Sequence, residues 1–163
     1  MYSTPLITNK GKNKLEKELS YLWSNKRPII TQAVSDAAAL GDRSENAEYK
    51  EGKRLLREID RRIRHLRKRL DVLKVVNYSE EQEGKVYFGA WVELINDQNK
   101  TLRCRIVGPD EIDTRNTHIS IDSPMAKAML GKQENEEINV QTPSGGKTWV
   151  INVIQYQSFK NDE

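Results

Sequence analysis

Apolar positions in the first half of the chain recur at helical spacing in two runs. The first run follows Thr8, which we expect to be its N-cap, and its apolar stripe comprises Leu15, Leu19, Leu22, Ile29, Ala33 and Leu40. Pro28 has no backbone N–H, so we expect a kink there. The second run alternates steps of three and four, the spacing of a coiled-coil seam, through Tyr49, Gly52, Leu56, Ile59, Ile63, Leu66, Leu70 and Leu73. Only a partner helix buries such a seam.

The two runs are separated by a few residues after Leu40-Gly41, which predicts an antiparallel helical hairpin. Arms of about 30 residues at about 1.5 Å per residue make it roughly 45 Å long. Residues 41–45 then form its tip. Asp42, Glu45 and Glu48 place three carboxylates at and just after this turn.

After Tyr78 the period changes to two, which predicts strands over residues 85–95, 101–107, 117–121, 138–142 and 147–156. Turns are expected at 96–97, 108–110 and 143–146. One short helix interrupts them, with Ser123 as N-cap, Pro124 at its first position and Gly131 closing it. The sequence therefore predicts an α+β protein in which a coiled-coil hairpin domain (1–76) and a linker (77–84) precede a small, mostly antiparallel sheet domain (85–163).

Composition fits a two-part molecule, since a hydrophobic share of 36% is low for one compact globule of 163 residues. Cys104 is the one cysteine, so no disulfide forms within the chain, and a reducing, cytoplasmic setting fits. Neither an export signal nor an apolar run of about 18 residues is visible, so we expect no membrane association.

Charge is concentrated on the second helical run. Residues 50–69 carry ten Lys or Arg against three acids, a local charge of +7 in a chain whose formal net charge is +3. One interpretation is a solvated helix face, partly neutralised by pairs such as Arg54–Glu58 and Arg57–Asp60. The other is a site for a phosphate backbone. No aromatic residue interrupts the run, which favours backbone contact over base stacking. The candidate nucleic-acid-binding residues are Lys53, Arg54, Arg57, Arg61, Arg62 and Arg64.

Asp42 and Glu45 allow two interpretations. Their D-x-x-E spacing is that of a capping box for the second helix, and a turn of this kind needs a cap. Alternatively, Ser44 or the backbone supplies the cap, and the two carboxylates face outward to hold a cation. Two carboxylates are too few ligands for a complete Mg²⁺ site, so such a site would form only where another molecule supplies more ligands and a phosphate. Glu48 is the acid that we favour least.

Other motifs carry less chemistry. Residues 144–149, "SGGKTW", end like a phosphate-binding loop but lack its first glycine and precede a strand. His65, His118 and Cys104 are too scattered for a zinc site or a thiol–histidine pair. No segment concentrates enough metal ligands and bases for a nuclease centre, so the sequence predicts an accessory factor with no cofactor of its own.

Long stretches of the chain resemble the bacterial GreA/GreB family of transcription elongation factors, and its GreB members more closely. They are "LGDRSENAEY" (40–49), "LREIDRRIRHL" (56–66), "EGKVYFGAWVEL" (83–94), "RIVGPDEI" (105–112) and "ISIDSPMAKAML" (119–130). The resemblance implies a coiled coil that enters the secondary channel of RNA polymerase and an FKBP-like domain that grips the channel's rim, through a motif that matches Asp122, Ser123 and Pro124. Lys12 stands where an aromatic residue is common in the family.

The resemblance also implies a role for the tip. Asp42 and Glu45 would help the polymerase retain a shared Mg²⁺ and so stimulate cleavage of backtracked RNA 3′ ends, while the arginine patch would contact the extruded RNA. The chain itself would be no enzyme, and we expect a monomer. Two other hypotheses remain, a channel regulator that does not stimulate cleavage and a coiled-coil scaffold whose tip only caps a helix.

Overall fold

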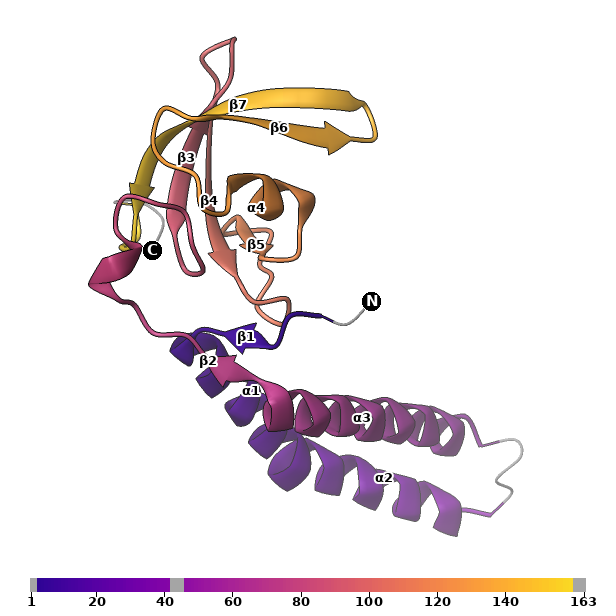
Figure 1. Ribbon diagram of the computed structural model, residues 1–163. Helices are drawn as coiled ribbons and strands as arrows, with labels where there is room; N and C mark the ends of the chain where they lie inside the picture. The colour runs from indigo at the N-terminus through magenta and orange to yellow at the C-terminus, as the bar shows by residue number, and fades with distance from the viewer. Residues whose placement is uncertain (1–2, 42–45, 160–163) are drawn as a thin grey trace. The chain divides into compact units, whose positions relative to one another are not determined.

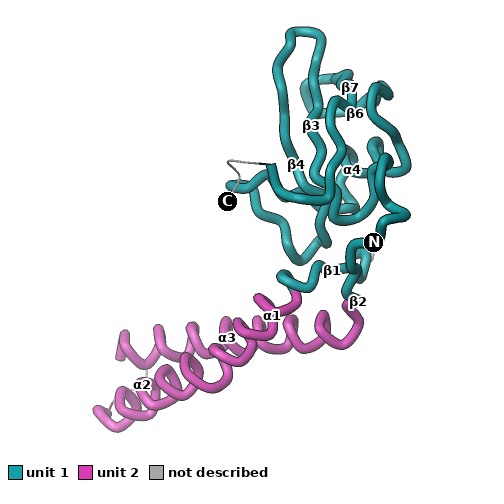
Figure 2. Tube along the Cα trace, turned by 90° about the vertical axis from the view of Figure 1, so that its left-hand side faces the viewer, with its two compact units in different colours: residues 1–11, 74–163 teal, residues 12–73 magenta. Residues whose placement is uncertain are grey.

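The computed structural model describes residues 3–41 and 46–159, which divide into two compact units (Figures 1 and 2). One unit comprises residues 12–73 and contains the hairpin; the other comprises residues 1–11 and 74–163 and contains the main sheet. The sequence-based boundary assigned residues 1–11 to the hairpin. They belong to the other unit because they form a strand and hydrogen bonds there, as described below.

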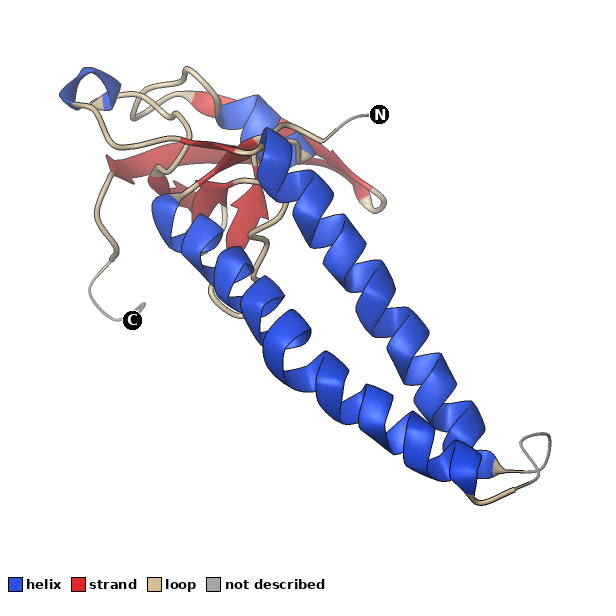
Figure 3. Ribbon diagram, turned by 90° about the horizontal axis from the view of Figure 1, so that it is seen from below, coloured by secondary structure: helices blue, strands red, loops and turns tan. Residues whose placement is uncertain are grey.

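The hairpin has two helical arms (Figure 3), one of them interrupted by a π-helical turn. The interrupted arm runs through helix α1 (Asn9–Tyr21), a π-helical turn (Leu22–Lys26) and helix α2 (Arg27–Ala39), and the returning arm is helix α3 (Ala47–Val72). Thr8 caps α1 as predicted, because its Oγ1 accepts a hydrogen bond of 3.0 Å from the backbone N–H of Gly11. The predicted helical hairpin is confirmed.

Pro28 changes the register of the first arm. The π-helical turn ends just before it, and the N–H of Arg27 reaches back five residues to the carbonyl of Leu22. Since a proline cannot donate the next helical hydrogen bond, the wider turn accommodates it without ending the helix. The extra residue rotates everything after it by about 100° around the helix axis.

The apolar stripe predicted for the first arm is therefore wrong beyond Leu22. Ile29 is 67% exposed and Leu40 is 77% exposed, and Ala33 is exposed as well. Val34 and Ala37 turn inward in their place, half-buried and buried respectively. A stripe predicted at a constant 3.6 residues per turn therefore falls on the wrong face of the helix after a π-helical turn.

The seam predicted on α3 is confirmed. Gly52, Ile59, Ile63, Leu66 and Leu73 are buried, and Tyr49, Leu56 and Leu70 are half-buried. Gly52 allows a close approach of the two arms, because a Cβ added there would lie 2.7 Å from Val34 Cγ2.

The described residues of the other unit form a five-stranded sheet in the order β5-β4-β3-β7-β6. Its strands are β3 (Trp91–Ile95), β4 (Thr101–Val107), β5 (His118–Ser120), β6 (Glu137–Thr142) and β7 (Gly145–Gln155). Only the β4–β5 pair is parallel, so the predicted mostly antiparallel sheet is confirmed. Helix α4 (Pro124–Met129) lies beside it (Figure 1), and together they enclose a core that includes Val92, Leu94, Ile106, Met129 and Ile151.

The strand expected from residue 85 begins only at Trp91. Gly89 has a φ of +86°, and the N–H of Ala90 donates to the carbonyl of Tyr87 at 3.1 Å, so a turn interrupts the segment. Before the turn, Lys85 forms only an isolated antiparallel bridge, with Gln133. A short 3₁₀ helix, Glu80–Gln82, lies in the segment expected as a linker. Alternation of apolar residues alone does not distinguish a strand from such a turn.

Two short parallel strands, β1 (Leu6–Ile7) and β2 (Lys74–Val75), were not predicted from the apolar pattern. Two carboxylates also hold the N-terminal segment. Asp122 accepts hydrogen bonds from the N–H (3.0 Å) and hydroxyl of Thr4, and Glu111 accepts from the N–H (3.0 Å) and hydroxyl of Thr8.

Candidate nucleic-acid interface on the hairpin

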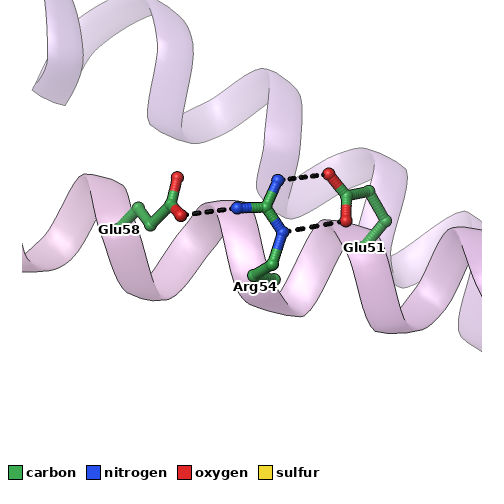
Figure 4. Close-up of polar contacts among 3 residues, drawn as sticks. All are labelled: Glu51, Arg54 and Glu58. Atoms are coloured by element: carbon green, nitrogen blue, oxygen red, sulfur yellow. Dashed lines mark hydrogen bonds and ion pairs between the residues drawn. The ribbon is translucent and has the colours of Figure 1, made fainter.

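The predicted nucleic-acid-binding residues all lie on α3 with exposed side chains, but they differ in their partners. Arg54 lies between two carboxylates of its own helix, as Figure 4 shows. Its Nε and Nη2 donate to Glu51 at 2.9 and 2.5 Å, and its Nη1 donates to Glu58 at 2.5 Å. Hydrogen bonding to Arg54 lowers the pKa of Glu51, which favours the ionised carboxylate. The predicted Arg54–Glu58 pair is confirmed.

Arg62 is also paired, across the hairpin. Its Nε and Nη2 donate to Glu18 of α1 at 2.7 and 2.9 Å. The hydrogen bond from Arg62 lowers the pKa of Glu18. This bidentate pair fixes a planar guanidinium on a planar carboxylate, so it links the two arms.

The predicted Arg57–Asp60 pair is wrong, because Asp60 accepts from Arg27 of α2 instead, at 2.7 Å from Nε and 3.4 Å from Nη2. Sequence spacing favours partners on the same helix, but the opposite arm comes closer to Asp60. Arg57 is left without an ion pair among the described residues.

Four of the six candidates remain without an ion pair inside residues 3–41 and 46–159, namely Lys53, Arg57, Arg61 and Arg64. Steps of four, four and three residues place them along one face of α3. The row extends over roughly 17 Å at about 1.5 Å per residue. A stripe of cations like this one can bind the phosphates of a polyanion with few contacts to its bases.

An aromatic side chain does accompany this basic face, although it is absent from the sequence run. Trp23, in the π-helical turn of the other arm, is 50% exposed. The guanidinium carbons of Arg27 and Arg67 lie 5.5 and 4.8 Å from its ring centroid. No aromatic residue interrupts the run itself, but the fold adds one from 44 positions away. The preference for backbone contact over base stacking stays a prediction.

Asp42 and Glu45 lie outside the described residues, so the structure assigns them no position. It does identify the cap of the helix that follows. α3 begins at Ala47, and its N-cap is Asn46, whose Oδ1 accepts from the N–H of Tyr49 at 3.1 Å. The prediction that Asp42 is the N-cap of this helix is therefore wrong, because Asn46 takes that place, and the other contacts of Asp42, Ser44 and Glu45 lie outside the described residues. The Nδ2 of Asn46 also donates to the carbonyl of Ala37 at 2.7 Å.

Elsewhere, the described part of the chain offers no group of three His, Cys, Asp or Glu that could hold a metal ion. Cys104 is buried, and burial raises the pKa of its thiol to about 12. His118 is half-buried, its Nε2 has no hydrogen-bond partner among the described residues, and its ring makes a T-shaped contact with Trp91 at 5.4 Å between centroids. Of the helices in the two described ranges, none has the length and apolarity to cross a membrane.

The three residues predicted to contact polymerase lie together at the start of α4. Asp122 holds Thr4, Ser123 caps α4 by accepting from the N–H of Ala126 at 3.2 Å, and Pro124 is exposed in the first turn. These hydrogen bonds stabilise the turn that carries the exposed Pro124.

The hairpin and the sheet unit each match a family model. Residues 5–75 match the model "Transcription elongation factor, N-terminal", and residues 81–156 match "Transcription elongation factor, GreA/GreB, C-term". These define the class as a transcription elongation factor. The chain belongs to the GreA/GreB family.

Its relatives include proteins named Transcription elongation factor GreB. The protein of Pseudomonas putida is 60% identical, with 94% of this chain and 95% of that protein covered, and the protein of Vibrio cholerae is 60% identical over 94% and 96%. The protein of Yersinia pestis is 55% identical over 99% and 95%. A solved GreA/GreB structure from Nitrosomonas europaea is 21% identical, with 94% and 100% coverage and a TM-score of 0.43.

Proposed function

We propose that this elongation factor stimulates cleavage of backtracked RNA by RNA polymerase, through a hairpin whose tip enters the polymerase's secondary channel. The observation that carries the proposal is a pair of carboxylates, Asp42 and Glu45, in the turn between two packed helices of a GreA/GreB family member. The chain is an accessory factor, and the polymerase supplies the catalytic centre.

The two tip carboxylates would share a Mg²⁺ ion with the polymerase, and that ion when bound activates water for phosphodiester hydrolysis. The cap of α3 supports this role for the carboxylates. Since Asn46 satisfies the first-turn N–H of Tyr49, neither Asp42 nor Glu45 is needed as the N-cap. Two negative charges near the N-terminus of α3 are also favoured by the helix dipole.

The unpaired cations of α3 would hold the RNA that backtracking extrudes. Lys53, Arg57, Arg61 and Arg64 supply charge along one face, so they would contact phosphates with little regard to sequence. Arg54 and Arg62, each occupied by carboxylates, would contribute less than the sequence run suggests.

The sheet unit would bind the rim of the channel through the segment of Asp122, Ser123 and Pro124. Its exposed Pro124 is the group available for contact, while Asp122 and Ser123 fix the turn. A monomer acting in the cytoplasm, where the polymerase lies, fits this role.

The test is a backtracked elongation complex of purified polymerase with end-labelled RNA and Mg²⁺. The wild-type chain is expected to release short 3′ fragments. Asp42→Asn and Glu45→Gln are expected to bind polymerase and lose most of that release, whereas Glu48→Gln, an exposed acid in the first turn of α3, serves as the matched control and retains it.

Undiminished release by the Asp42→Asn, Glu45→Gln double variant would contradict the metal role. Binding without any release by the wild-type chain would instead favour a channel regulator that does not stimulate cleavage. If the wild-type chain fails to bind polymerase, the assignment of both partner and function is wrong.

A further inference from the structure

Trp23 has an unusual position for a tryptophan on a two-helix arm. Half of its surface is exposed, yet two guanidinium groups lie near its ring. A tryptophan that served only to pack the arms together would bury its ring in the seam, as Leu22 does next to it. The half of Trp23 that is exposed, beside the two guanidinium groups that lie over its ring, is therefore open to a ligand.

The two arginines beside the ring differ in charge balance. Arg27 is held by the carboxylate of Asp60 through two hydrogen bonds. Arg67 makes no ion pair with any residue that the structure describes, and its recorded contact is the ring of Trp23 at 4.8 Å. Arg27 is thus held in place beside the ring by Asp60. Arg67 is positioned by the ring, and no carboxylate among the described residues neutralises its charge.

The surroundings extend this charge. Arg64 and Lys68 lie three residues before and one after Arg67 on α3, both exposed and without an ion pair among the described residues. Arg64 is also the last member of the cationic row that starts at Lys53. The row therefore ends about one helical turn before Arg67, the residue whose guanidinium lies over the exposed indole.

An exposed aromatic ring beside unpaired cations matches a ligand with a flat ring and a phosphate. Single-stranded nucleic acid has both in every residue, and proteins bind it through stacking on aromatic rings combined with a cationic groove. A duplex does not offer the face of a base in this way, because its bases are stacked on one another.

We propose that Trp23 and Arg67 form a stacking site for one base of a single RNA strand, at the end of the cationic row of α3. The base stacks on the indole, and Arg67 contacts the base or its phosphate. The identity of the strand as extruded RNA rests on the proposed function, but the chemistry of the site does not.

The test follows the three indole N–H signals of the full chain, labelled with ¹⁵N-tryptophan, by nuclear magnetic resonance. Trp23→Phe assigns the Trp23 signal by its loss. The probes are an adenosine octaribonucleotide and an abasic octamer with the same number of phosphates, each titrated to millimolar concentration so that weak binding is observed.

The adenosine octamer is expected to shift the Trp23 signal selectively and to bind at least ~5-fold more tightly than the abasic octamer, the lower end of what one stacked base contributes. Trp23→Leu is expected to remove this preference, and Trp23→Phe to keep most of it. Tyr21→Leu is the matched control, since Tyr21 is 56% exposed, two residues away, and has no recorded cation contact in the described ranges. It should leave the preference unchanged.

Each ratio compares two probes on one variant, so a partly unfolded variant does not distort it. Equal affinity of the wild-type chain for the two octamers would overturn the proposal, as would a preference that survives Trp23→Leu or is lost equally in Tyr21→Leu. The outcome is separable from the cleavage assay: a chain that stimulates cleavage without base preference would refute only the stacking site, and the reverse result would refute only the proposed function.

Discussion

Replacing Asn46 by Ala tests how the turn end of the hairpin is stabilised. The side chain joins the two arms at this end, because its Oδ1 accepts from Tyr49 N–H and its Nδ2 donates to the Ala37 carbonyl. Alanine removes both hydrogen bonds and leaves one N–H of the first turn of α3 without its cap.

The expected cost is about 1.5 kcal/mol. Loss of an N-cap typically costs about 1 kcal/mol, and the second hydrogen bond adds about 0.5 kcal/mol. The second term is at the low end because the Ala37 carbonyl keeps the N–H of Leu40 at 3.2 Å. Asn46→Asp keeps the acceptor and adds a charge that the helix dipole favours, so it should cost less than ~0.5 kcal/mol.

Thermal unfolding followed by circular dichroism at 222 nm measures the change. If residues 12–73 melt as their own unit, 1.5 kcal/mol lowers Tm by roughly 6–12 °C; if the chain melts as one, by roughly 3–6 °C. Asn13→Ala, at an exposed position of α1, is the control and should not lower Tm. A Tm for Asn46→Ala within about 1 °C of wild type, or equal Tm values for the Ala and Asp variants well below it, would refute this account of the cap.

Three further predictions concern packing and titration. Gly52→Ala should lower the free energy of unfolding by about 1 kcal/mol, although alanine has the better helix propensity, because the new Cβ would lie 2.7 Å from Val34 Cγ2. Adding Val34→Ala should recover more than half of that loss. A Gly52→Ala variant more stable than wild type would contradict this account. Burial raises the pKa of Cys104 to about 12, so this thiol should react with a thiol reagent at pH 8 only as fast as the protein opens. Rapid labelling of the folded chain would disprove its burial. The hydrogen bond from Arg62 lowers the pKa of Glu18, so the unfolded chain binds more protons near that pKa and the pair stabilises the fold above the ordinary carboxyl pKa. This contribution is lost as the pH falls below the ordinary pKa and through the lowered one. Chemical denaturation should therefore show a slightly smaller acid loss of stability for Glu18→Gln, by well under ~1 kcal/mol for this exposed pair, and an identical loss would rule it out.

Local patterns predicted the elements whose stability is local. The seam on α3, the Thr8 cap, strand Thr101–Val107 and the Ser123–Pro124 start of α4 all follow from residue type and spacing within one or two turns. The apolar stripe of the first arm failed at the π-helical turn before Pro28, because one extra residue moves every later side chain to a new face.

The site divides in the same way. The sequence by itself located the basic helix and the two acids of the turn, since charge density and D-x-x-E spacing are visible without a fold. It could not show that Asp60 binds Arg27 on the other arm, that Asn46 caps α3, or that Trp23 lies against Arg67. Those contacts join residues on different helices or on either side of a turn. They depend on the register between the two arms. Packing at Gly52 and the π-helical turn determine that register, and the periodicity within one helix carries no information about it.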